Sequence, residues 1–168
     1  MIQVYGRCFA ALVLVFISGC ETHYGDRCLE TVQKISLENH LKSYVFQTKH
    51  HKIFALLGLQ QQGRVSQKES TELHVYIEGD GLAWASRFHI SLDPTPVQPT
   101  GLTLAMADRT SATKVYLSRP GHYIEDSRLG LYSWTFARFS VETIETYDEI
   151  IDQLHQLYPG AHISLFGY

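Results

Sequence analysis

The order in which β-prone runs and helical segments follow one another limits the folds open to this chain. Two short runs, 44–48 and 53–57, flank a polar four-residue break and predict a β-hairpin. Three further runs, 73–77, 114–117 and 162–166, are separated by helical patterns. Strands that alternate with helices call for a parallel sheet with right-handed crossovers. The sequence therefore predicts an α/β fold with an N-terminal hairpin and three parallel strands.

Two crossover helices are predicted between these strands. Three prolines lie between positions 94 and 99, where they forbid a helix, and an apolar helical segment follows over 100–107. A longer helix begins after Ser140, a favourable N-cap residue, and ends at Pro159-Gly160. Its apolar side chains recur at spacings of 3 and 4 and predict one buried stripe, Ile144, Tyr147, Ile151, Leu154 and Tyr158. Residues 60–72 are polar and predict a loop.

Composition excludes several classes of protein. Hydrophobic residues make up 45 % and charged residues 18 % of the 168 positions, which is too apolar for a disordered chain. The net charge of −3 lacks the basic excess of a nucleic-acid binder, so we expect no nucleic-acid partner. Three cysteines cannot build a disulfide scaffold, and Cys28 is expected to be an inert thiol.

The N-terminus has the pattern of an export signal. Arg7 is followed by nine apolar residues, 9–17, which suit a signal-peptide core and are too few to span a bilayer. The run ends in Ile17-Ser18-Gly19-Cys20, which resembles the bacterial lipobox. We therefore expect residues 1–19 to be a lipoprotein signal, Cys20 to be lipidated, and 20–43 to form a tether with a helical piece at 29–41. An ordinary signal peptide is the alternative.

This resemblance implies where the protein is found. A lipidated Cys20 would make the chain an exported bacterial lipoprotein that faces the periplasm or the cell surface. Several acyl chains on one cysteine anchor a protein stably, at about 0.8 kcal/mol per buried CH₂ group. The membrane is then a partner through the lipid anchor.

Two of the predicted parallel strands run directly into glycine loops. Residues 73–77 continue into Glu78-Gly79-Asp80-Gly81, and 114–117 continue into Ser118-Arg119-Pro120-Gly121. Ligands of open α/β sheets bind outside the carboxyl ends of the strands, and glycine lets the backbone approach a ligand closely. The alternative is that these glycines only form turns.

Several motifs, among them these two glycine loops, resemble those of the α/β-hydrolase superfamily, and of bacterial hydrolase-like lipoproteins within it. The resemblance covers 44–168 and corresponds to the N-terminal half of that domain. The matching residues are Tyr76-Ile-Glu-Gly-Asp-Gly81, Asp93-Pro-Thr-Pro96, Leu117-Ser-Arg-Pro120, Trp134-Thr135, Arg138-Phe-Ser140 and Leu165-Phe-Gly-Tyr168.

The resemblance implies a role for two pairs of residues. The loop after the first parallel strand supplies an oxyanion-hole amide in this fold, which by position is the backbone N–H of Gly81 or Leu82. Gly167 and Tyr168 match the start of the nucleophile elbow, which in relatives continues with Ser-Gly-Gly. The serine, acid and histidine of the triad would then follow Tyr168, so residues 1–168 alone are expected to be inactive.

The resemblance to α/β-hydrolases leaves two functions open. The chain belongs either to a serine hydrolase that cleaves an ester-type bond by acyl transfer, or to a non-catalytic envelope lipoprotein that binds or anchors. Its substrate is not indicated. The last strand, 162–166, would be an unpaired sheet edge without further strands, which predicts self-association.

Carboxylates and histidines near these loops do not predict a catalytic or metal site. An anion directed at an oxyanion would oppose catalysis, so Glu78 and Asp80 are expected to bond loop amides or Arg119. The histidine pairs lack the spacing of a metal site, since there is no His-Glu-x-x-His motif. We expect no metal and no cofactor.

Overall fold

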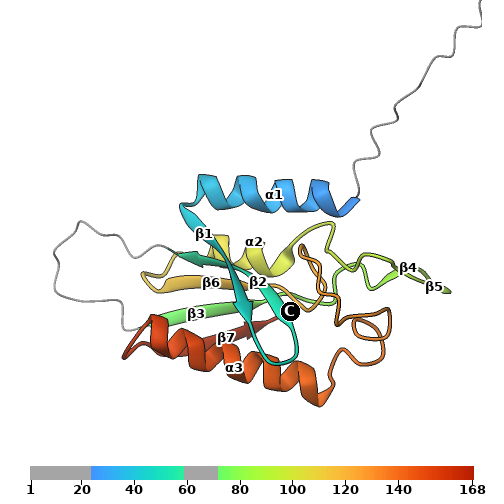
Figure 1. Cartoon of the computed structure of the whole chain (residues 1–168). Helices are drawn as coiled ribbons and strands as arrows, with labels where there is room; N and C mark the ends of the chain where they lie inside the picture. The colour runs from blue at the N-terminus through green and yellow to red at the C-terminus, as the bar shows by residue number, and fades with distance from the viewer. Residues whose placement is uncertain (1–23, 59–71) are drawn as a thin grey trace, which may run out of the picture.

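The structure is a computed structural model that describes residues 24–58 and 72–168 (Figure 1). The predicted signal peptide, the lipidated Cys20 and almost all of the predicted loop at 60–72 lie outside the described residues. None of the described helices is long and apolar enough to cross a membrane.

The described part of the chain forms an α/β fold around a mixed sheet of five strands in the order β1-β2-β6-β3-β7. The hairpin strands β1 and β2 are antiparallel, β2 joins β6 antiparallel, and β6, β3 and β7 are parallel. The strands are β1 (Leu41–Gln47), β2 (Lys52–Gly58), β3 (Glu72–Ile77), β6 (Thr113–Leu117) and β7 (His162–Gly167). The predicted hairpin and parallel strands are therefore confirmed.

Within the described residues, three helices cover both faces of the sheet. They are α1 (Tyr24–Glu38), α2 (Thr100–Ala107) and α3 (Val141–Leu157). Figure 1 shows α1 and α2 on one face and α3 on the other. Alternation along β2 supplies both cores, because Ala55 belongs to the cluster under α3 while Leu56 belongs to the cluster under α1 and α2. Burial on both faces explains why β2 is a nearly continuous apolar run.

The path of the chain reverses at β3. From β3 the chain passes through α2 to β6 on one side, and then through α3 to β7 on the other side of β3. Crevices for ligands in open α/β sheets lie outside the carboxyl ends of the strands, at such a reversal. The loops that follow β3, β6 and β7 are therefore the candidates for a ligand-binding site.

The crossover helices begin as their sequences predict, but the buried face of α3 differs from the expected stripe. The Ser140 side chain caps α3 by accepting a hydrogen bond from the Thr143 amide. Ile144 is 57 % exposed, whereas Thr146 and Ile150 are fully buried. The other residues of the predicted stripe pack in the core, and the buried face extends from them towards Thr146, which accepts a hydrogen bond from Thr48 in the β1–β2 turn.

Two segments were not predicted as the structure has them. Residues 20–43 were expected to form a tether, but the helix within them, α1, packs against the sheet through Cys28 and Val32. The domain accordingly begins before residue 44. A small hairpin, β4 (Trp84–Ser86) and β5 (His89–Ile90), lies between β3 and α2 and was not among the predicted strands.

Strand β7 forms one edge of the described sheet. Leu165 is 57 % exposed and Phe166 is 41 % exposed, although Phe166 stacks on Tyr76 of the neighbouring strand with ring centroids 4.8 Å apart. Ile163 packs under α3 with the core. Within the described residues, β7 is therefore covered better by α3 than on its opposite face.

Candidate functional site

The carboxyl ends of β3 and β7 lie side by side. Ile77 is the register partner of Gly167, so the loop that follows β3 begins next to Tyr168. Gly79 leaves room for the Tyr168 ring, because a Cβ at position 79 would lie 2.7 Å from Tyr168 Cδ1. Residues about ninety positions apart in the sequence, the predicted oxyanion loop and the predicted elbow, are thus brought together.

Gly81 sits at the tightest point of this loop. Its φ of 61° lies in the left-handed region, and a Cβ there would overlap the Pro94 carbonyl oxygen. The Leu82 amide donates a hydrogen bond to that same oxygen at 2.8 Å. Of the two predicted oxyanion donors, the Leu82 amide is therefore committed to the turn, and Gly81 is the remaining candidate.

Both carboxylates of the loop are held by protein groups. Glu78 is only 2 % exposed and accepts hydrogen bonds from the amides of Gly79 and Gly101 and from the Tyr116 hydroxyl. Pro99, the N-cap residue of α2, makes no side-chain hydrogen bond to the first turn of the helix. Glu78, which directly follows β3, caps the helix instead by accepting from the Gly101 amide. Asp80 pairs with Arg119. The expectation for both residues is confirmed.

Arg138 is a partner of Asp80 that the sequence did not reveal. Its Nε lies 3.1 Å from Asp80 Oδ2, and Arg119 Nη1 lies 3.6 Å from Asp80 Oδ1. Arg119 also donates a 2.6 Å hydrogen bond to the Arg138 carbonyl. The only signal was the presence of both arginines in motifs that resemble hydrolase relatives, and nothing in their spacing indicates contact.

His122 lies against the other side of Gly81. It is 1 % exposed, its Nδ1 accepts a hydrogen bond from the Arg119 amide at 3.4 Å, and Nε2 has no partner in hydrogen-bond geometry among the described residues. Burial lowers the pKa of His122 to about 3, with a further contribution from the charge of Arg119 and a small opposing effect of the Asp80 backbone. The imidazole is therefore neutral at physiological pH.

Arg119, Arg138, Asp80 and His122 line one small cavity, together with Thr143 of the first turn of α3. Its space for the centre of a water molecule is about 10 Å³. A cavity of that size holds about one water molecule. The cavity is adjacent to the loop after β3 and could receive a small polar group.

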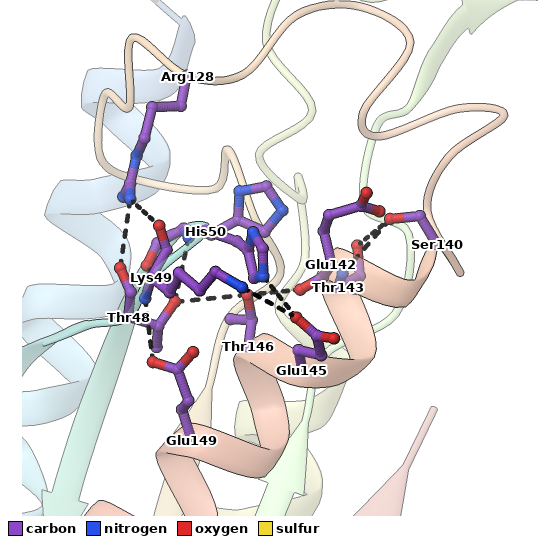
Figure 2. Close-up of polar contacts among 11 residues, drawn as sticks. Thr48, Lys49, His50, Arg128, Ser140, Glu142, Thr143, Glu145, Thr146 and Glu149 are labelled. Atoms are coloured by element: carbon purple, nitrogen blue, oxygen red, sulfur yellow. Dashed lines mark hydrogen bonds and ion pairs between the residues drawn. The ribbon is translucent and has the colours of Figure 1, made fainter.

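A second group of polar contacts fastens the β1–β2 turn to α3 (Figure 2). His50 Nε2 lies 2.6 Å from Glu145 Oε2, and the Lys49 amide donates to Glu149 at 3.0 Å. Arg128 donates to the carbonyl oxygens of Thr48 and Lys49, both at 3.2 Å. These bonds join the turn to the helix and to the loop after β6, so we interpret the group as structural.

Asp126 completes that attachment from the loop after β6. It accepts hydrogen bonds from the Lys52 amide and from Arg128. Burial by itself would raise the pKa of Asp126, but the bonds from Arg128 and the Lys52 amide outweigh this effect and lower the pKa to about 2. Asp126 therefore stays ionised and holds the hairpin against the loop after β6.

A third polar group, around His74, resembles a catalytic pair but lies elsewhere. His74 Nδ1 is 2.8 Å from Asp108 Oδ2, and the Tyr76 hydroxyl donates to the same oxygen at 3.0 Å. Asp108 follows α2, at the amino-terminal side of the parallel strands. Because this is the opposite edge of the sheet from the loops after β3 and β7, the group contributes to packing.

Metal ligation finds no support in the described part of the chain, which holds no group of three or more His, Cys, Asp or Glu side chains arranged to bind an ion. Cys28 is a buried free thiol in the core under α1.

Comparisons with family models, with curated proteins and with solved structures found no match for this chain.

The first prediction concerns Gly81. Gly81→Ala should lower the free energy of unfolding by more than the roughly 1–2 kcal/mol of left-handed strain, because its Cβ also meets the Pro94 carbonyl. Gly160→Ala, where φ is 77° and no atom lies within 4 Å, should show the strain alone. Gly130→Ala, in open space, should change stability by less than about 0.5 kcal/mol. Urea unfolding gives the order, and equal losses at 81 and 160 would refute the close approach.

The second prediction concerns the pH dependence of stability. The pKa of His122 is lowered to about 3 in the folded chain, so the unfolded chain takes up this proton first as the pH falls. The contribution of neutral His122 to the free energy of unfolding is fully present above about pH 6.5. It is lost as the pH falls towards 3, at up to about 1.4 kcal/mol per pH unit. Urea unfolding from pH 7 to 4 should show a shallower pH dependence in His122→Gln. Parallel curves, or an imidazole that titrates near pH 6.5 by NMR, would contradict the assignment.

Proposed function

We propose that this chain supplies the N-terminal half of a serine α/β-hydrolase domain, held at the bacterial envelope by a lipidated Cys20. The reaction is acyl transfer from an ester-type substrate. In this proposal the nucleophile is the serine of the elbow motif Gly-x-Ser-x-Gly, of which Gly167 and Tyr168 are the first two residues.

The observation that carries the proposal is the pairing of β3 with β7. It sets the loop after β3 beside Tyr168, at the carboxyl edge of three parallel strands. Acyl transfer by this kind of site needs an attacking serine and an oxyanion donor within reach of the same carbonyl group. The two elements that would supply them are neighbours in the sheet.

In this proposal the Gly81 amide is the first oxyanion donor. A preorganised amide stabilises the negative charge that develops on the substrate oxygen, and the loss of one donor raises the barrier by roughly 2.7–4 kcal/mol. A carboxylate at the same place would cancel that effect. Glu78 is turned into the cap of α2 and Asp80 is held by two arginines, so neither opposes the amide.

The third prediction tests the nucleophile. The native gene, expressed with the DNA that follows codon 168, should give a protein that a fluorophosphonate probe labels on the serine after Tyr168. Replacement of that serine by alanine should abolish labelling. Ser164→Ala, a matched change four residues before Tyr168 on β7, should leave labelling intact, and residues 1–168 expressed alone should not be labelled.

Two outcomes would contradict the hydrolase proposal. One is an adduct on a serine within residues 1–168. The other is a downstream reading frame without Ser-Gly-Gly, which would favour the non-catalytic envelope lipoprotein instead.

The fourth prediction tests the anchor. Mass spectrometry of the mature protein should find a diacylglyceryl group on an N-terminal Cys20, and the protein should fractionate with membranes. Cys20→Ser should release it from the membrane fraction, because the anchor is lost. Cys8→Ser, which lies within the predicted signal, should not. A mature chain that begins elsewhere without lipid would refute the anchor and leave the hydrolase proposal untouched.

A further inference from the structure

The cavity beside Gly81 carries an excess of positive charge. Two guanidinium groups, those of Arg119 and Arg138, face it together with a single carboxylate, that of Asp80. His122 adds no charge, because its pKa is lowered to about 3 by burial and by the nearby Arg119. The charged side chains that line the cavity therefore sum to about one unit of positive charge.

Asp80 does not satisfy either arginine fully. The 3.6 Å separation from Arg119 is too long for a hydrogen bond, and the buried Nε of Arg138 is close to Asp80 without hydrogen-bond geometry. Arg119 donates through Nη2 to the Arg138 carbonyl, and Arg138 donates through Nη1 to the Thr135 carbonyl. Each guanidinium has five N–H donors. Most of these donors have no acceptor within the described residues.

Both guanidiniums are held in place by the same aromatic ring. The Cζ atoms of Arg119 and Arg138 lie 5.3 Å and 4.9 Å from the centroid of the Phe139 ring. Cation–π attraction at these distances orients the two planar groups without using their N–H donors. Both guanidinium groups also approach the Asp80 carboxylate, which supplies one negative charge for two positive charges.

The surroundings add to the positive potential. Thr143, in the first turn of α3, lines the same cavity, so the amino-terminal end of a 17-residue helix, which carries partial positive charge, lies beside it. Glu142 is exposed on that turn, and hydrogen bonds from its own backbone amide and from the Ser140 side chain lower its pKa, with further contributions from the charges of His50 and His51. Glu78 is committed to the cap of α2.

We propose that Arg119 and Arg138 bind one oxyanion group, a carboxylate or a phosphate, on the substrate. Paired guanidiniums match the two oxygens of such a group better than any other side chains do. The cavity itself has room for about one water molecule, so the oxyanion group binds at its solvent side, where the Arg138 side chain is 39 % exposed. The assignment of this group to the substrate rests on the proposed hydrolase function, whereas anion binding itself does not.

The fifth prediction tests binding without catalysis. Inorganic phosphate and acetate are titrated into the full chain, with chloride at the same ionic strength as the control, while NMR follows the arginine Nε–Hε signals. Saturable shifts are expected for Arg119 and Arg138. Arg138→Gln should weaken binding about tenfold or more. Arg138→Lys, which keeps the charge but not the fork, should give an intermediate loss.

Two further variants separate this site from general electrostatics and from a structural role. Arg87→Gln removes the same charge from an arginine that stacks on Phe88 outside the cavity, and should leave binding unchanged. Asp80→Asn removes the competing carboxylate, so binding should become about fivefold tighter. Equal losses at 87 and 138, or weaker binding after Asp80→Asn, would overturn the proposal.

The results distinguish this proposal from the hydrolase proposal. Anion binding without serine labelling would keep the subsite and refute the enzyme. Serine labelling without saturable binding of either anion would keep the enzyme and overturn the subsite.

Discussion

The Glu78 carboxyl group joins three elements on which the candidate site depends. Glu78 directly follows β3. Its carboxyl group accepts a hydrogen bond from the Gly101 amide at the start of α2 and another from the Tyr116 hydroxyl on β6. A buried carboxyl is costly unless its oxygens are satisfied, and the donors here come from the loop after β3, from α2 and from β6. The direction in which the chain leaves β3 is therefore set by this one side chain. The turn through Gly81 follows from it.

The elements that could be predicted from the sequence are those whose signals are local. Ser140 marks the start of α3, and the apolar run after the prolines marks α2, because capping and backbone restriction act within a few residues. The exposed Ile144 shows the limit of this reasoning. A 3.6-residue period identifies a helix, but its rotation is decided by what it packs against.

The candidate site was predictable in its backbone and not in its side chains. Glycines after two buried strands indicated the loops, and the parallel order of the strands brought the loops to one edge. The contact of Asp80 with Arg138 joins positions 58 residues apart, and its geometry depends on the loop that runs from β6 to α3. His122 likewise reads as an ordinary loop residue, because its burial comes from the turn at Gly81 that closes over it.

At this edge of the sheet, the neutral imidazole of His122 lines the same cavity as the charged side chains of Arg119 and Arg138. A protonated His122 beside Arg119 would add a second uncompensated charge to a buried space, and burial disfavours this, as its lowered pKa shows. Its neutrality leaves the two arginines and Asp80 as the groups that set the potential. Because Arg119 follows β6 and Arg138 precedes α3, the potential depends on the sheet and on the crossover together. A displacement of α3 would therefore move Arg138 relative to Asp80 and so change the electrostatic potential at the site.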